Sequence, residues 1–296
     1  MAVRRDTVSA SLSGPLVAQR ARDFSKMLLK DRRLLTGVLI LAAAVLAASV
    51  LPSFIPYGPL QTEPGATLQP PSLNHPMGTD HFGRDILVRV LYGVRLDLRI
   101  AVMVALTALV AGTLVGTFSG YYGGIVDDVI MRITDVMMAF PSFVLAMAIT
   151  AMLGNTIPNV VLAIAFSYSP FFIRLTRAEV LSARELGYVE AARCVGNPDW
   201  RIMYLHLLPN CLTPALVQAT LCLGWAILTA AGLAFLGLGI RPPTPEGGVL
   251  VAEGAGDVIS GQWWTSLFPG VVIVFMAFGF NLIGDCLRDI TAQEER

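Results

Sequence analysis

The stretch EAARCVGNPDWRIMYLHLLP, residues 190–209, is the most informative part of this 296-residue chain. It belongs to a polar segment that separates two long apolar stretches, and it holds too many polar residues to cross a lipid bilayer. Gly196 marks the end of a helix, because glycine readily adopts the left-handed conformation found at many helix C-termini. The pattern therefore predicts one helix from about residue 178 to residue 195 and a bend at Gly196.

The residues that follow the bend predict a second, short helix. Asn197 offers an N-cap oxygen, Pro198 suits the first helical position, and Asp199 places a negative charge in the first turn. Pro209 cannot donate a backbone hydrogen bond, so we expect this helix to run from Trp200 to Leu208 and to stop there. Such a pair of helices, with small side chains near its bend, can dock against another protein. The alternative is a loop that packs only on the chain's own membrane helices.

The composition of the whole chain indicates a protein that lies in lipid. Hydrophobic residues make up 55% of the chain, charged residues only 14%, and the mean hydropathy is +0.66. One soluble core of this size could not bury so much apolar surface. The 21 basic residues are balanced by 21 acidic ones, so no net positive field points to nucleic acid as a partner. The four cysteines have no C-x-x-C spacing and are interpreted as packing residues.

Six apolar stretches are long enough to cross the bilayer core, which requires about 20 residues per helix. None of them carries a charged residue in its interior. The first stretch is too long and begins too far into the chain for a cleavable signal peptide, so we expect it to remain as an anchor. The predicted membrane helices cover residues 34–55, 100–118, 135–153, 157–173, 211–240 and 265–284.

The distribution of positive charge predicts the orientation of these helices. With the N-terminus in the cytoplasm, sixteen of the 21 Lys and Arg residues lie on the cytoplasmic side. Both termini are therefore expected inside the cell. Trp263 and Trp264 then fit an aromatic belt at the outer membrane surface. Residues 16–33 predict an amphipathic helix on the inner surface, with a disordered basic tail as the alternative, and the proline-rich residues 56–80 predict an irregular external segment.

The informative stretch also resembles the EAA loop of type I ABC importer permeases, whose usual form is EAA-x3-G-x9-I-x-L-P. The spacing matches throughout, and His206 stands at the Ile position, as in the peptide-importer branch. In that family the segment is a coupling helix that sits in a cleft of the ATP-binding subunit. The resemblance implies that the contact residues here are Glu190, Ala191, Ala192 and Gly196, with Leu208 and Pro209 fixing the return to the membrane.

Further motifs look like those of the C-type permeases of dipeptide, oligopeptide and nickel importers. They are GTDHFGRD at 78–85, FLGLG at 235–239, PPTP at 242–245 and FNLIGD at 280–285. The resemblance covers nearly all of residues 20–290.

This sequence departs from the family pattern at a few positions. Val88 and Asp97 stand where the family usually has serine, and Glu246-Gly247 replaces an expected Ser-Trp after the proline run. These departures concern the class of substrate and leave the family resemblance intact.

The resemblance implies an all-α polytopic membrane protein with six transmembrane helices and the type I ABC importer (MetI-like) permease fold. Residues 1–55 would form the cytoplasmic amphipathic segment and the first membrane helix, and residues 56–95 the external segment. Residues 96–290 would form a five-helix permease core that includes the coupling loop, residues 178–209. The protein is expected in the bacterial inner membrane, with both termini in the cytoplasm.

The implied function is that of a non-catalytic permease subunit of an ATP-driven importer of di- or oligopeptides. Its expected partners are a second permease subunit in a heterodimer, two ATP-binding subunits, an extracytoplasmic substrate-binding protein, the peptide substrate and membrane lipid. ATP and Mg²⁺ would be bound by the partner subunits, so no cofactor, catalytic residue or metal site is expected in this chain. The substrate-binding residues are not assigned, although Ser142, Thr150, Thr229 and Asn281 offer hydroxyl or amide groups.

Other functions find less support in the sequence. His75 and His81, near Asp80 and Asp85, could hold a metal, but the surrounding Pro and Gly favour a hydrogen-bonded turn. The chain has no phosphate-binding loop, because neither of its lysines follows a glycine. An ATP-independent secondary transporter is the main alternative, and an importer permease for nickel or another small solute is a second. Charge-free helix interiors argue against proton coupling, although Pro141, Pro158 and Pro170 could break helices around a backbone-lined site.

Overall fold

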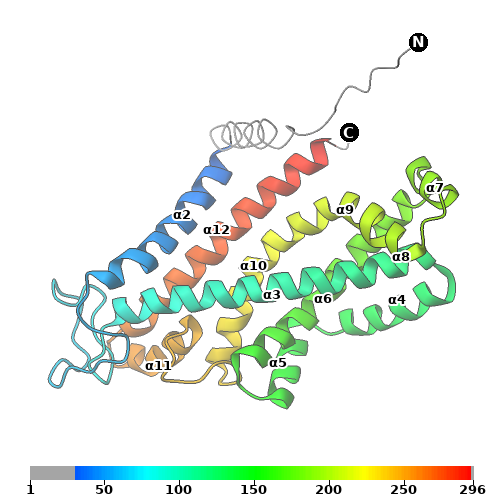
Figure 1. The fold of residues 1–296 in the computed structure, drawn as a ribbon. Helices are drawn as coiled ribbons and strands as arrows, with labels where there is room; N and C mark the ends of the chain where they lie inside the picture. The colour runs from blue at the N-terminus through cyan, green and yellow to red at the C-terminus, as the bar shows by residue number, and fades with distance from the viewer. Residues whose placement is uncertain (1–30, 295–296) are drawn as a thin grey trace, which may run out of the picture.

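The computed structural model describes residues 31–294, and these residues form an all-α structure without a β-strand (Figure 1). The fold class predicted from the sequence is confirmed. The α-helices are α2 (Arg32–Val50), α3 (Ile86–Tyr122), α4 (Gly124–Met138), α5 (Ser142–Leu153), α6 (Ile157–Ala183), α7 (Gly187–Cys194), α8 (Asp199–Arg201), α9 (Leu208–Asn210), α10 (Leu212–Phe235), α11 (Gly247–Ile259) and α12 (Trp264–Glu294). A 3₁₀ turn at Leu51–Ser53 extends α2, and a π-helical segment at Ile202–Leu207 joins α8 to α9. The amphipathic helix predicted for residues 16–33 lies almost entirely outside the described residues.

Five helices are long and apolar enough to cross a membrane, namely α2 with its 3₁₀ extension, α3, α6, α10 and α12. A sixth crossing is reached if α4 and α5 count as one span, but the chain bends by 91° between them. The membrane helix predicted for 135–153 is therefore not continuous, and it breaks at Pro141, which was expected from the sequence as a possible break. Pro141 stands at the break, where its ring and its missing N–H interrupt the helical hydrogen-bond ladder. Pro170, by contrast, lies inside α6, which continues past it.

Helix α3 is the longest element, with 37 residues, and it begins well before the predicted residue 100. Asp85 starts it by accepting a hydrogen bond from the backbone N–H of Val88, at 2.9 Å. The first ten residues of α3 consequently belong to residues 56–95, which were expected to form the external segment before the permease core.

Close packing of α3 against α6 forms the centre of the bundle. Glycines at 112, 116 and 120 place the backbone of α3 directly against α6. A Cβ atom on Gly116 would lie only 2.6 Å from the carbonyl oxygen of Ile173, so a larger residue there would push the two helices apart. Helix α10 completes this core, with Ala226 and Leu233 fully buried.

The N-terminal helix α2 runs along α12, so the two ends of the described chain lie side by side (Figure 1). Gly37 allows this approach, because a Cβ there would be 2.8 Å from the carbonyl oxygen of Gly279. At the open end of the pair, Arg33 forms an exposed ion pair with Asp289 at 3.0 Å.

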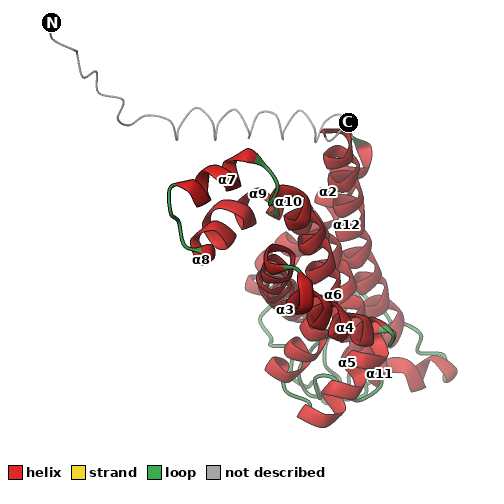
Figure 2. Cartoon of the chain, turned by 90° about the vertical axis from the view of Figure 1, so that its right-hand side faces the viewer, coloured by secondary structure: helices red, strands yellow, loops and turns green. Residues whose placement is uncertain are grey.

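The chain's polar parts gather at the two opposite ends of the bundle. Helices α7, α8 and α9 project at one end, whereas α11 lies with the irregular segment 54–85 at the other (Figures 1 and 2). Trp264 at this second end is buried, and its indole N–H donates to the carbonyl oxygen of Thr79 at 3.3 Å. It is thus a packing residue, and the prediction of a two-tryptophan surface belt is wrong for Trp264, while Trp263 is 45% exposed.

Candidate functional site

The segment predicted to be the coupling loop, residues 178–209, forms a compact helical hairpin at the end of α6. Helix α6 ends at Ala183, a short turn follows, and α7 then occupies Gly187–Cys194. The chain reverses at Gly196, whose φ of +84° is the left-handed conformation expected for that residue. The return arm runs from α8 through the π-helical segment into α9.

Three local predictions for this loop are wrong. The expected continuous helix 178–195 is interrupted between Ala183 and Gly187, which lets α7 turn back over the end of the bundle. Asn197 does not act as the N-cap, because Pro198 occupies the N-cap position of α8. The side-chain amide of Asn197 instead donates to the carbonyl oxygen of Ala192 at 3.1 Å.

The return arm also does not stop before Pro209, since α9 includes this residue. The backbone N–H of Leu208 bonds to the carbonyl of Met203, five residues back. This wider π turn comes directly before Pro209, which has no backbone N–H to donate to the helix.

The predicted contact residues are divided between the two faces of α7. Glu190 and Ala191 are exposed, whereas Ala192 is half-buried and packs on the loop's own apolar cluster. Gly196 is exposed at the bend, with no atom near the position of a Cβ. On the return arm, Leu208 is half-buried and Pro209 is exposed. The structure therefore brings Glu190, Ala191 and Gly196 to the surface of one hairpin.

A small apolar cluster beneath α7 fixes the hairpin to the bundle. Val189, Ile202 and Leu207 have no exposed surface, and they pack with Val180 of α6 and Tyr121 of α3. Burial of several such side chains stabilises the hairpin by roughly 1.5–3 kcal/mol for each fully buried side chain. The loop is thus a rigid projection attached to two core helices.

The outer surface of the hairpin carries large apolar side chains that the sequence analysis did not single out. Val195 is 82% exposed, Leu205 58% and Trp200 55%, and Leu186 and Tyr188 are also exposed. Large apolar residues grouped on a polar projection indicate a protein-binding surface. Trp200 could have indicated this surface from the sequence, because a tryptophan in a short polar segment between helix-breaking residues has few apolar neighbours in that segment to bury it.

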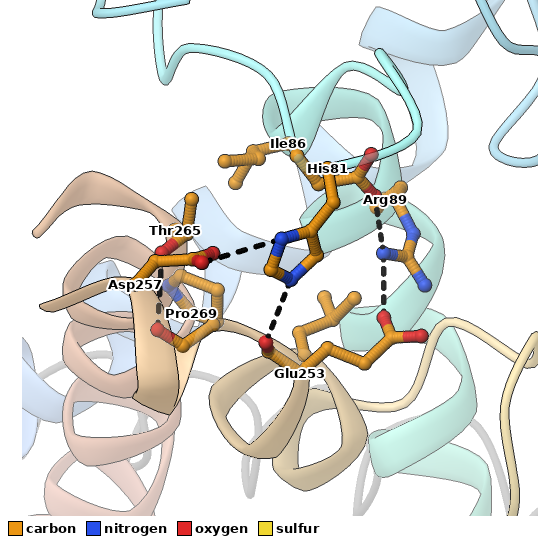
Figure 3. A pocket seen from close by; sticks show the side chains of 10 residues that line it. His81, Ile86, Arg89, Glu253, Asp257, Thr265 and Pro269 are labelled. Atoms are coloured by element: carbon orange, nitrogen blue, oxygen red, sulfur yellow. Dashed lines mark hydrogen bonds and ion pairs between the residues drawn. The ribbon is translucent and has the colours of Figure 1, made fainter. Parts of the chain in front are cut away.

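The other end of the bundle holds a buried ion network (Figure 3). The Nη1 atom of Arg89 lies 2.7 Å from Asp80 and 2.7 Å from Glu253, and Arg84 binds Asp80 at 2.6 Å. Arg89 is only 2% exposed, so these partners compensate a charge that has lost its hydration. Through this network the segment before α3 is fastened to α11.

The two histidines of the external segment do not converge on one site. His75 contacts Asp85 at 2.8 Å, whereas His81 faces Asp257 at 3.2 Å and the carbonyl oxygen of Glu253 at 3.0 Å (Figure 3). Within residues 31–294 no group of three metal-ligating side chains could hold an ion. The hydrogen-bonded turn is confirmed as the role of His75, because Asp85 and Ser72 close the turn around it.

Two of the departures from the family pattern, Asp97 and Glu246-Gly247, meet in space. Asp97 of α3 accepts a hydrogen bond from the backbone N–H of Gly247 at 3.3 Å, and Glu246 caps α11 by accepting from Val249 at 2.8 Å. Both acids are buried, and the Oε1 atom of Glu246 has no hydrogen-bond partner in the described part of the chain. Burial raises the pKa of the Glu246 carboxyl above its ordinary value.

Two of the four polar residues considered for substrate contact already have partners. The hydroxyl of Thr150 donates to the carbonyl oxygen of Ala146 at 2.8 Å within α5. The hydroxyl of Thr229 is 2.6 Å from that of Tyr168, and both threonines are buried. Ser142 and Asn281 are half-buried.

Comparison with known proteins adds independent findings. Residues 112–296 match the family model described as the binding-protein-dependent transport system inner membrane component. The chain is 44% identical to a dipeptide transport system permease protein of Alkalihalophilus pseudofirmus, over 90% of this chain and 88% of that protein. It is 41% identical to the dipeptide transport system permease protein of Escherichia coli K12, over 96% of both chains. It is 40% identical to a di/tripeptide transport system permease protein of Pseudomonas aeruginosa, over 90% of both chains.

Proposed function

This chain belongs to the family of binding-protein-dependent transport system inner membrane components, and from that premise we propose that it is a permease subunit of an ATP-driven importer of di- or oligopeptides. It is a multi-pass membrane protein that works with other transporter subunits. In this proposal it forms half of the translocation pathway and has no catalytic residue, because ATP and Mg²⁺ are bound by the partner subunits. The proposal of a peptide cargo is supported by the similarity to dipeptide and di/tripeptide transport system permease proteins.

The observation that carries the coupling role is the form of the loop between α6 and α10. Its inner side is locked to α3 and α6 by fully buried side chains, and its outer side exposes Trp200, Val195 and Leu205. A rigid, apolar projection on a membrane protein suits an interface that transmits force, because its core does not deform when a partner pulls on it. Glu190, Ala191, Ala192 and Gly196 are the proposed contacts with an ATP-binding subunit, and Leu208 and Pro209 lead the chain back to the bundle.

The two ends of the bundle suggest the arrangement of the other partners. If the coupling loop faces the cytoplasm, the segment 54–85 and α11 lie at the extracytoplasmic surface, where a substrate-binding protein would deliver the peptide. A second, related permease completes the pathway. Both chain termini then lie in the cytoplasm of a bacterium, and the protein resides in the inner membrane. ATP binding and hydrolysis alternate the access of the shared cavity between the two sides.

The proposal is tested by co-purification of the chain with its co-expressed partner subunits in detergent, followed by an ATPase assay. We expect ATP-binding subunits to be retained by the wild type and lost from the Ala191→Glu and Trp200→Ala variants. Both positions are exposed, so neither change disturbs the core. Ala292→Glu, at an exposed site of α12, is the matched control and should retain the subunits. A chain that purifies alone and moves solute in ATP-free liposomes would instead be a secondary transporter.

A further inference from the structure

Tyr121 lies in the last turn of α3 and contacts both arms of the hairpin. The residue is only 8% exposed and belongs to the apolar cluster beneath the coupling loop, and its hydroxyl donates to the Oδ1 atom of Asp199 at 2.7 Å. The guanidinium of Arg193 lies over the Tyr121 ring, 5.5 Å from its centroid. One side chain of α3 therefore contacts α7 through Arg193 and α8 through Asp199, which are the two arms of the hairpin.

The backbone around Tyr121 also forms hydrogen bonds with the coupling loop. Arg184, in the turn between α6 and α7, donates to the carbonyl oxygens of Gly120 at 2.9 Å and Tyr121 at 3.4 Å. These carbonyls belong to the last turn of α3 and have no partner within the helix. The coupling loop thus contacts the end of α3 through three residues, Arg184, Arg193 and Asp199.

Helix α3 is suited to carry movement away from this point. Its 37 residues correspond to about 55 Å at the rise of an α-helix. At its far end it carries Arg89, the centre of the ion network that fastens the segment before α3 to α11. A shift of the hairpin that displaces Tyr121 would therefore also displace α3, which reaches the opposite end of the bundle as one continuous helix.

We propose that Tyr121 is the positioning residue through which displacement of the coupling loop moves α3. The inference rests on the proposed function, since it requires the loop to dock on ATP-binding subunits. It goes beyond that function because the residue lies outside the loop motif and within a membrane helix. The hydrogen bond to Asp199 connects α3 to the return arm of the hairpin, and the stacking of Arg193 connects α3 to α7.

The test uses the complete transporter in proteoliposomes, with uptake of a dipeptide and ATP hydrolysis measured together. Tyr121→Phe removes only the hydroxyl and is expected to reduce uptake per ATP hydrolysed by about fivefold or more, while ATP-binding subunits remain bound. Tyr122→Phe is the matched control, because the exposed Tyr122 ring packs on Phe118 and its hydroxyl has no partner among the described residues. This control should keep the wild-type ratio.

Variants of Asp199 separate a positioning role from a merely structural one. Asp199→Asn keeps an oxygen that accepts from Tyr121, so its uptake per ATP hydrolysed should stay within about twofold of the wild-type value. Asp199→Leu has no such oxygen, so its uptake per ATP hydrolysed should fall as far as that of Tyr121→Phe. The double variant Tyr121→Phe/Asp199→Leu should be no worse than either single variant, since both remove one interaction.

The possible failures are distinguishable. A Tyr121→Phe transporter with the wild-type ratio overturns the inference, and so does one that loses its ATP-binding subunits, because Tyr121 would then only maintain the fold of the loop. If the wild type itself binds no ATP-binding subunit, the proposed function fails and the inference falls with it.

Discussion

Asp97 of α3 and Glu246 at the start of α11 face each other in the protein interior, although a long stretch of chain separates them. Each carboxylate accepts a hydrogen bond from the first turn of α11, at Gly247 and Val249 respectively. No Lys, Arg or His forms an ion pair with either acid within residues 31–294. Burial of Glu246 away from any such cation raises the pKa of its carboxyl above the ordinary value.

This pair makes the stability of the protein depend on pH. Burial raises the pKa of Glu246, so the folded state binds its proton more tightly than the unfolded state. Stability is then fully present below the ordinary Glu value of 4.5 and is lost as pH rises through the folded value. A difference of one bound proton corresponds to about 1.4 kcal/mol per pH unit in that range. Glu246→Gln should flatten this part of the dependence, which thermal unfolding in detergent from pH 4.5 to 8 measures.

The control for that experiment is Glu185→Gln, because Glu185 is exposed in the turn between α6 and α7. It should leave the pH dependence of unfolding unchanged. An unaltered pH profile in Glu246→Gln would mean that the buried pair does not hold the proton.

Replacing Gly196 should uncouple transport from ATP hydrolysis. Its φ of +84° is disfavoured for a β-branched residue, and holding Val there costs about 1–2 kcal/mol, so Gly196→Val should distort the bend of the hairpin. We expect uptake to fall about tenfold or more while ATP hydrolysis continues. Gly187→Val is the matched control, since Gly187 has open space at the Cβ position and no left-handed backbone. Undiminished uptake in Gly196→Val would contradict the docking role of the hairpin.

Truncating Arg89 should destabilise the end of the bundle that carries α11. Arg89→Met removes the guanidinium that lies 2.7 Å from both Asp80 and Glu253, whereas Arg84 stays beside these acids at 2.6 Å and 3.4 Å. Because breaking a buried pair with no remaining partner costs about 3–5 kcal/mol, we expect a loss of about 3 kcal/mol, at the lower end of that range. The exposed Arg99 provides a comparison on the same helix, and Arg99→Met should change stability by about 0.5 kcal/mol or less. Unfolding in detergent measures both. Equal stability of the two variants would show that the network contributes little.

Much of the fold follows from local patterns in the sequence. Apolar stretches of sufficient length predicted the membrane helices, because the thickness of the bilayer requires them whatever their neighbours are. Gly196 predicted the bend of the hairpin, because few other residues adopt its backbone conformation. These are properties of a few consecutive residues. The structure has the left-handed backbone at Gly196 and five helices that are long and apolar enough to cross a membrane.

Helix ends were predicted less well, since they depend on what each end meets. The start of α3 at Ile86 and the passage of the return arm through Pro209 both depend on caps and packing that propensity does not contain. The burial of Trp264 likewise depends on Thr79, far away in the sequence, which accepts its indole hydrogen bond.

The amino-acid sequence by itself determined that this chain is an all-α membrane protein and that one polar hairpin interrupts its helices. Only the tertiary structure decided which distant residues meet. Tyr121 and Asp199 form their hydrogen bond, and Asp97 reaches the start of α11, because helix packing brings separate segments together. The length of an apolar stretch decides whether a helix can cross the membrane, but the side chain that a buried polar group finds depends on the geometry of the whole bundle.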